Sequence, residues 1–360
     1  MRIVVATSSY PGTESDASGH FVRAHARRLA RGAGAEVTVI APGARGEVDV
    51  EAVGSGSVLV VRTGGAALFA WPGAAARARE RPARLLAAPA ALVRAAHAAR
   101  TLGPFDRAVA HWIVPSAFPV LAGVDAPLEI VAHGADVRLL VAAPAALRSA
   151  IVSRVLARSD RLCFVAASLR DELARALPWA LARRLHERAT IAMAPIDLPD
   201  RGELGDPRAS LGLAAGTRYA AWVGRVVSSK RPLLALEAAR AAGLVLVFTG
   251  DGPGLDEVRA SAARAPTGGP ALIVTGRLPR SRALAIVAAA SVLLHTSMVE
   301  GAPTVVREAR ALGVPVVACP AGDLAAWARL DPGIEIAAPS PTALAAALGR
   351  AVAPRTEAAA

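Results

Sequence analysis

The fold is decided by residues 291–320, which read SVLLHTSMVEGAPTVVREARALGVPVVACP. The β-branched run 291–297 predicts a strand. Pro303 suits the first turn of a helix over about 303–312, and Gly313 ends that helix. The run 315–320 predicts a second strand. Strand, helix and strand in this order are typical of a βα unit in a parallel sheet.

The same alternation runs along the whole chain. Short β-branched runs, each followed by a turn and a stretch rich in Ala, Leu and Arg, occur at 3–7, 36–42, 105–111, 128–134, 219–224, 244–250 and 271–276. This pattern predicts an α/β, doubly wound fold in which parallel strands are covered by helices on both faces. The helix after the first strand is expected to bury Val22, Ala26, Leu29 and Ala30 on one face.

Two such domains are expected in a chain of 360 residues. The segment 196–207, IDLPDRGELGDP, is rich in Pro, Gly and Asp, and the strand pattern starts again after it. We predict an N-terminal domain over 1–198, a C-terminal domain over 199–342, and a helix and tail over 343–360. Ligands of doubly wound sheets bind outside the carboxyl ends of the strands, which predicts a site in a cleft between the domains.

The charge balance does not by itself define a partner. The chain has 41 basic and 29 acidic residues, a net charge of +12, yet Lys230 is its single lysine and it has no Asn or Gln. Much of the basic excess therefore reflects a skewed composition. No aromatic-interleaved basic stripe, zinc finger or helix-turn-helix pattern is present, so we expect no nucleic-acid partner. Cys163 and Cys319 have no partners at metal-ligand spacing, which indicates a reducing, cytoplasmic location and no metal site.

Two features bear on membranes. The longest uncharged stretches, 108–124 and 283–299, are broken by polar residues, so no transmembrane helix is expected. Residues 63–86 carry Phe69 and Trp71 followed by a cluster of arginines. This composition fits a helical cover over the first domain, or a surface that rests on an anionic membrane at its inner face, where a lipid-linked acceptor waits.

The start of the helix near residue 303 is a candidate anion site. Free amides and the positive end of a helix dipole suit a phosphate, which makes the backbone near 301–305 a plausible cradle. Glu308 lies ~7.5 Å further along the helix, where a carboxylate can accept hydrogen bonds from both ribose hydroxyls. Glu300 stands just before the cradle, where a sugar on the terminal phosphate would lie. The alternative interpretation is a loop charge and a solvated helix face.

Other charged side chains follow strand ends. In 222–232, WVGRVVSSKRP, Arg225 and Lys230 suit a diphosphate leaving group, or form an ordinary exposed pair of cations. His111 and His133 also end strands; His111 is expected to be structural, while both roles stay open for His133. The loop before residue 20 lacks the G-x-G-x-x-G spacing, which excludes an NAD site.

These segments together resemble a known family. They are SGHFVRAHARRLA (18–30), AHGAD (132–136), VGR (223–225) followed by Lys230, GDGP (250–253) and EGAPTVVREARALGVPVVA (300–318). The set is similar to the retaining GT-B glycosyltransferases of family 4, also called group 1. The resemblance implies two Rossmann-like domains that face a cleft, with a nucleotide-diphosphate sugar on the second and the acceptor on the first. One departure is 194–197, where relatives commonly have an Asn-Gly pair.

The resemblance also implies roles for residues. Arg225 and Lys230 would bind the diphosphate, Glu308 the ribose and Glu300 the donor sugar, while His133 would contact the sugar near C6. The other implied donor contacts are Gly19 against the diphosphate, Gly250 in the Gly-rich turn, Arg277 and Leu278 near the base, and the backbone of Gly301, Ala302, Pro303 and Thr304 near the sugar and phosphates. Glu300, His133, Lys230 and Arg225 are the expected catalytic groups.

The expected reaction is glycosyl transfer with retention. Arg225, Lys230 and the amides of the helix start do the work of a metal, because they stabilise the departing diphosphate. The departing phosphate helps to take the acceptor proton on the same face. No cofactor besides the donor is expected, and the acceptor is a saccharide, a lipid-linked compound or a small molecule. Two alternatives stay open: a GT-B sugar-nucleotide epimerase and a catalytically silent nucleotide-sugar-binding subunit.

Overall fold

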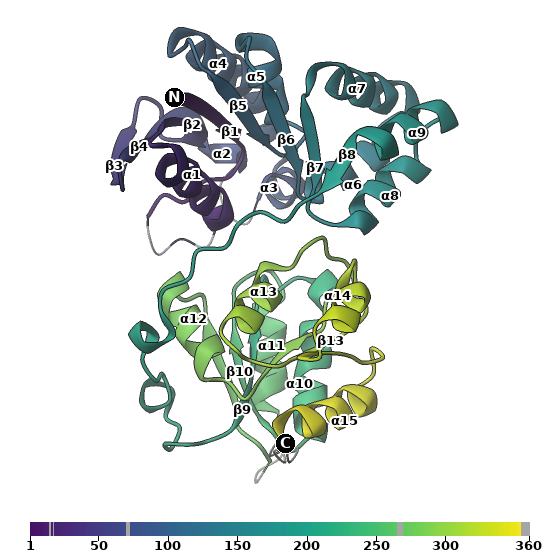
Figure 1. The fold of residues 1–360 in the computed structure, drawn as a ribbon. Coiled ribbons are helices and arrows are strands. Elements are labelled where there is room, and N and C mark those ends of the chain that lie inside the picture. The colour runs from purple at the N-terminus through teal and green to yellow at the C-terminus, as the bar shows by residue number, and fades with distance from the viewer. Residues whose placement is uncertain (14–15, 17, 70–72, 265–268, 354–360) are drawn as a thin grey trace, which may run out of the picture. The chain divides into compact units, whose positions relative to one another are not determined.

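The computed structural model describes residues 1–13, 16, 18–69, 73–264 and 269–353. The chain divides into two compact units, Met1–Asp197 and Leu198–Ala360 (Figure 1). Trp71 and the tail 354–360, both part of our sequence predictions, lie outside the described residues. Two α/β units with largely parallel sheets confirm the predicted GT-B class of fold.

Within its described residues, the first unit has one eight-stranded sheet in the order β3-β4-β2-β1-β5-β6-β7-β8. The strands are β1 (Arg2–Thr7), β2 (Glu36–Gly43), β3 (Val48–Val53), β4 (Gly56–Gly65), β5 (Arg107–His111), β6 (Leu128–Ala132), β7 (Arg161–Phe164) and β8 (Ala189–Ile191). All neighbours pair in parallel except β3 and β4, which form an antiparallel hairpin at the edge. The purely parallel sheet that we predicted is therefore wrong at this edge, because the connection of β3 to β4 is a tight turn with no crossover helix.

Helices connect the strands of this unit. They are α1 (His20–Ala33), α2 (Ala66–Phe69), α3 (Ala74–Glu80), α4 (Ala87–Thr101), α5 (Ala117–Gly123), α6 (Ala135–Ala142), α7 (Ala145–Arg158), α8 (Ala167–Arg175) and α9 (Trp179–Arg188), with a 3₁₀ turn η1 (Pro82–Leu86). The predicted face of α1 is confirmed: Val22, Ala26 and Ala30 are buried and Leu29 packs beside them, against Val5 and its neighbours in the sheet. Figure 1 shows α4 and α5 side by side, and both contact the sheet.

In the second unit, six strands within the described residues form a parallel sheet in the order β11-β10-β9-β12-β13-β14. They are β9 (Tyr219–Val223), β10 (Val245–Thr249), β11 (Leu272–Gly276), β12 (Val292–His295), β13 (Val316–Ala318) and β14 (Ile334–Ile336). The helices are α10 (Pro232–Ala241), α11 (Leu255–Ala263), α12 (Arg280–Ala289), α13 (Thr304–Ala311), α14 (Leu324–Leu330) and α15 (Pro341–Val352), with 3₁₀ turns η2 (Arg201–Leu204), η3 (Ala209–Leu211) and η4 (Ser228–Lys230).

Apolar layers cover both faces of this second sheet. Ala220 and Trp222 on β9 point into a cluster with α10, α11 and α15, whereas Tyr219 and Ala221 point into a cluster with α12 and α13. This alternation is what a strand buried on both faces requires. The linker is tied to the same unit, since the Arg201 guanidinium donates to the carbonyls of Leu312 (2.7 Å) and Ala288 (2.9 Å).

Among the residues that the structure describes, no helix is both long and apolar enough to cross a bilayer. The two uncharged stretches of the sequence instead form β5 with α5, and α12 with β12. The described residues between 66 and 86 form three short helical segments, α2, α3 and η1, and α2 contacts β2 and α4.

Candidate functional site

The predicted donor residues of the second unit lie on loops at one edge of its sheet. Arg225 and Lys230 follow β9, Gly250 follows β10, Arg277 and Leu278 follow β11, and Glu300 to Thr304 follow β12. Because these four strands are neighbours and parallel, their carboxyl ends meet at the same edge. Arg225 and Arg277 are exposed there, whereas Leu278 packs against the core.

An ion pair joins the loops after β9 and β12. The ammonium of Lys230 contacts Oε1 of Glu300, although the two residues are 70 positions apart, and the side chains are 19% and 10% exposed. The loop backbones are tied together as well. The Thr296 hydroxyl donates to the carbonyl of Lys230 (2.7 Å), and the amide of Met298 donates to the carbonyl of Ser229 (2.8 Å). The pair is therefore held in place by the fold.

His295, which sequence reasoning missed, completes this cluster. It is the last residue of β12 and is buried, with Nε2 2.9 Å from Oε1 of Glu300. The contact with Glu300 favours the charged form of His295, but burial opposes that form more strongly. Burial, assisted by the Lys230 charge, lowers the pKa of His295, so the ring is neutral. A histidine at a strand end was a signal in the sequence, as it was for His111 and His133.

Glu300 stays ionised in this setting. Burial alone would raise its pKa, but the His295 contact and the Lys230 charge outweigh burial and hold the pKa below the ordinary range. The site thus presents a fixed carboxylate, a fixed ammonium and a neutral imidazole at the carboxyl edge. Such a set can orient hydroxyl groups and accept negative charge beside the cation.

Backbones approach closely beneath this cluster at Gly250. A Cβ at residue 250 would lie 1.9 Å from the carbonyl oxygen of Gly224, so no side chain fits. The amide of Gly250 donates to the carbonyl of Gly276 (2.9 Å), which joins the loops after β10 and β11. Gly322 has a similar role, because a Cβ there would lie 2.7 Å from the carbonyl oxygen of Glu300. Gly250 therefore shapes the edge through its missing side chain.

Helix α13 begins at Thr304, with Pro303 just before it and Ala302 and Gly301 in the preceding loop. The helix is one residue shorter at each end than predicted. Glu308 is buried, and its Oε1 accepts a hydrogen bond from Nη2 of Arg280 at 2.6 Å. The solvated helix face considered for Glu308 is therefore excluded. Arg280, at the start of α12, was not identified from the sequence, where it stands three residues after Arg277.

The predicted residues of the first unit lie at the carboxyl ends of β1 and β6. Gly19 precedes α1 with φ 71°, and a Cβ there would lie 2.4 Å from the carbonyl oxygen of Ser9. His133 follows β6, and its ring lies 4.8 Å from the centroids of both Phe21 and Trp112. The buried carboxylate of Asp136 accepts hydrogen bonds from the amides of His133 (3.1 Å), Gly134 (2.9 Å) and Ile113 (2.7 Å). Asp136 therefore fixes the loop that carries His133.

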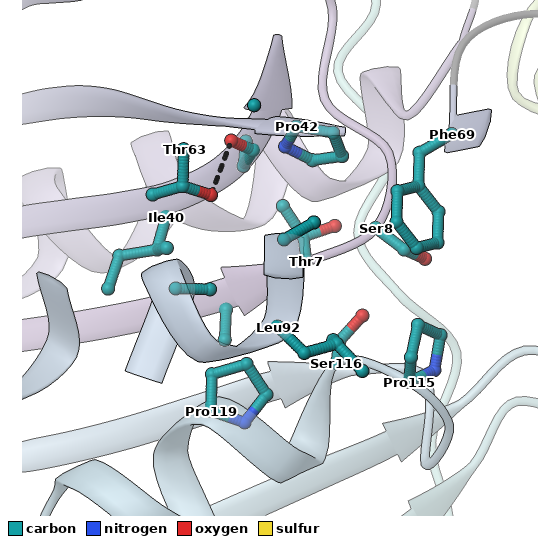
Figure 2. A pocket seen from close by; sticks show the side chains of 15 residues that line it. Thr7, Ser8, Ile40, Pro42, Thr63, Phe69, Leu92, Pro115, Ser116 and Pro119 are labelled. Carbon is teal, nitrogen blue, oxygen red and sulfur yellow. Dashed lines mark hydrogen bonds between the residues drawn. The ribbon is translucent and has the colours of Figure 1, made fainter. Parts of the chain in front are cut away.

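The first unit also has an uncharged pocket at the carboxyl ends of β1, β2 and β4 (Figure 2). Its volume is about 30 Å³, room for one small group. Thr7, Ser8 and Ser116 contribute hydroxyls, and Figure 2 shows prolines and Phe69 around them. The Ser116 hydroxyl is buried and has no hydrogen-bond partner among the described residues. The pocket therefore offers one free polar atom in an apolar wall.

Within the described part of the chain, no group of three or more His, Cys, Asp or Glu side chains is placed to hold a metal ion.

Part of the chain matches a known family of proteins. Residues 206–358 match the family described as "Glycosyl transferases group 1". No curated protein matches the sequence significantly. The match covers most of the second unit, and its family is the one that the sequence segments resemble.

Solved structures extend the likeness over 98% of this chain. A sucrose-phosphate synthase from Thermosynechococcus elongatus is similar with a TM-score of 0.68 at 19% identity, over 89% of that chain. A trehalose-6-phosphate structure from E. coli, bound with UDP-2-fluoro glucose, has a TM-score of 0.65 at 16% identity, over 91% of that chain. Anabaena HepE in complex with UDP has a TM-score of 0.59 at 14% identity, over 90% of that chain. At these identities the likeness establishes the GT-B fold.

Gly250→Ala should destabilise the second unit by about 2 kcal/mol, because the added Cβ meets backbone rather than a flexible side chain. Urea unfolding measures this effect. Gly349→Ala is the matched control: it lies in α15 with nothing within 4 Å of its Cβ position, so it should gain about 1 kcal/mol from helix propensity. Equal stabilities of the two variants would contradict the close approach.

Lys230→Met should lower the free energy of unfolding by about 3 kcal/mol, because it leaves the buried Glu300 carboxylate without its cation. Glu300→Gln removes the other charge, so the double variant should be less destabilised than the sum of the single variants by more than about 1 kcal/mol. Thermal and urea unfolding of the four proteins measure this coupling. Additive effects would show that the ion pair contributes nothing.

Proposed function

We propose that this protein transfers a sugar from a nucleotide-diphosphate sugar to an acceptor, with retention of anomeric configuration and without a metal ion. The observation that carries the proposal is the Lys230–Glu300 pair, held at the carboxyl edge of the second sheet next to the loop that leads into α13. It combines a fixed cation for phosphate with a fixed carboxylate for sugar hydroxyls.

The second unit has the charged groups that suit a nucleotide-diphosphate sugar. Lys230 has three N–H donors and uses one on Glu300, which leaves donors for a diphosphate. Arg225 lies exposed on the same loop and adds a second positive charge. Glu308, held by Arg280, is a rigid carboxylate on α13 that can accept hydrogen bonds from ribose hydroxyls. The UDP and UDP-2-fluoro glucose complexes of the two structural neighbours support a nucleotide donor.

The mechanism follows from these charges. As the bond between the anomeric carbon and the diphosphate breaks, negative charge develops on the leaving oxygen. Lys230 and Arg225 stabilise that charge without reorganisation, because the fold has already placed the ammonium. The departing phosphate takes the proton of the acceptor hydroxyl on the same face of the sugar. Glu300 supports the positive charge that develops on the sugar, and His133 contacts the sugar near C6.

The first unit has two surfaces that suit an acceptor. The pocket at the carboxyl ends of β1, β2 and β4 carries no charge, so the group that enters it is neutral and small. Its free polar atom, the Ser116 hydroxyl, can bond one oxygen of a saccharide or a small molecule. A lipid-linked acceptor is also compatible, because Leu85 and Leu86 are exposed beside arginines of α3 and η1, a surface suited to peripheral contact with an anionic membrane. Two buried free thiols, Cys163 and Cys319, fit a reducing cytoplasm.

Two alternatives are distinguished by products. A sugar-nucleotide epimerase would convert the donor without an acceptor, and a silent subunit would bind the donor without product. The intact pairs Lys230–Glu300 and Arg280–Glu308 favour transfer, because a protein that only binds nucleotide has no need for a carboxylate at the sugar.

Donor binding is tested by a thermal-shift screen against UDP-, GDP-, ADP- and TDP-sugars, because a ligand of the folded state raises Tm. One base should give the shift. Glu300→Gln should keep binding of the matching nucleoside diphosphate, since it removes a negative charge near phosphate, but cut turnover about 100-fold. Lys230→Met/Glu300→Gln, which has no unpaired charge, should lose both. A folded double variant with near-normal turnover would contradict the role of Lys230.

The stereochemistry and the metal are tested in one reaction. NMR of the first product should show the anomeric configuration of the donor, and EDTA should leave the initial rate unchanged, because the cations of the loop after β9 do the work of a metal. An inverted product, or a rate restored only by Mg²⁺ or Mn²⁺, would contradict this mechanism.

A further inference from the structure

Three histidines of the first unit form one hydrogen-bonded line. Nδ1 of His25, on α1, lies 2.9 Å from Nε2 of His111, at the end of β5. Nδ1 of His111 lies 2.9 Å from Nε2 of His133, which follows β6. The His111 ring is fully buried between the other two. Three of the seven histidines of the chain are thus joined in a row from α1 to the carboxyl edge of the sheet.

The rings of this line are neutral. Burial lowers the pKa of His133 to about 3, with a smaller effect from His25, and burial also lowers the pKa values of His111 and His25. Each neutral imidazole has one N–H donor and one acceptor nitrogen. Two successive hydrogen bonds therefore form only if all three protons lie on the same kind of nitrogen, Nδ1 in one state or Nε2 in the other.

The geometry forbids a mixed arrangement. If one ring had the other tautomer, two N–H groups or two lone pairs would face each other in a buried place, where an unsatisfied polar group is costly. Rotation of the last ring is hindered as well, because Phe21 and Trp112 lie against His133. The choice made at His25 is thereby passed to His133, two rings away.

We propose that His25 and His111 are positioning residues that set the tautomer of His133 through this hydrogen-bonded chain. The atom that gains from it is Nδ1 of His133, which no described residue uses as a hydrogen-bond partner. In the Nδ1–H state this atom offers a proton at the carboxyl edge, and in the Nε2–H state it offers a lone pair. The line of three histidines thus determines whether Nδ1 of His133 donates a hydrogen bond to a ligand oxygen or accepts one from a ligand hydroxyl.

The His25 end of this line of histidines lies among charged groups that can select one of the two tautomers. His25 lines a cavity of about 400 Å³ together with charged side chains from α1 and the sheet: Arg28, Arg107, Glu129 and Arg161. Glu129 is held by Arg107, and its charge acts on His25 against that of the arginines. A carboxylate favours an N–H that points toward it, whereas arginines favour a lone pair. The balance of these charges selects one state.

The test needs no substrate. Long-range ¹H–¹⁵N spectra of the full chain with labelled histidine distinguish Nδ1–H from Nε2–H rings. We expect His25, His111 and His133 to share one tautomer and to be neutral at pH 7. A spectrum in which one of the three rings has the other tautomer would overturn the proposal, whatever reaction the protein catalyses.

His25→Phe keeps a ring but removes both nitrogens, so the His133 signals should move toward an average of the two tautomers. In the transfer assay, kcat/KM should fall about tenfold, the value of one hydrogen bond. His25→Asn, which keeps a polar group near the Nδ1 position, should recover most of that loss. His97→Phe, on the exposed face of α4, is the control and should change nothing. An unchanged His133 tautomer in His25→Phe would overturn the proposal.

Discussion

The site depends on one partly buried ion pair, between Lys230 and Glu300. The strand order β9-β12 places two loops, 70 residues apart in sequence, side by side at the carboxyl edge of the second sheet. Lys230 and Glu300 neutralise each other there, which lets both charges exist where water is scarce. The hydroxyl of Thr296 and the close approach of Gly322 fix the backbones that carry them. In the proposed complex the diphosphate of the donor accepts a hydrogen bond from Lys230, and the sugar hydroxyls donate to Glu300.

The polar groups at the carboxyl edges of the two sheets differ in charge. The second unit uses charge: Lys230 with Glu300, and Arg280 with Glu308. The first unit adds neutral groups, namely a row of three imidazoles and a pocket with the hydroxyl of Ser116, beside the Asp136 carboxylate that holds the His133 loop. Charges suit a donor whose diphosphate departs as an anion, whereas neutral groups suit hydroxyls, which need direction more than charge.

Much of the architecture could be read from the sequence, because long β-branched runs and the Val22 face of α1 carry strong periodicity. The missed strands β7, β8 and β14 are only three or four residues long, too short for a period to appear. The hairpin β3–β4 was also missed, although Val48 and Val50 alternate with charged residues, a pattern that favours a strand with one buried face. At the site, residue types at strand ends identified Lys230, Glu300 and Glu308. His295 was marked by its place at a strand end, but its pairing, and that of Arg280, could not be predicted, since contacts across strands depend on register and on helix ends that sequence spacing does not specify.

The most direct measurement of the central claim is a crystal structure of this protein with an intact, unreactive nucleotide-sugar analogue. The account predicts diphosphate oxygens within hydrogen-bond distance of the Lys230 ammonium, the ribose at Glu308 and the sugar at Glu300. A diphosphate bound away from the loops after β9 and β12, with Lys230 still paired only to Glu300, would contradict it.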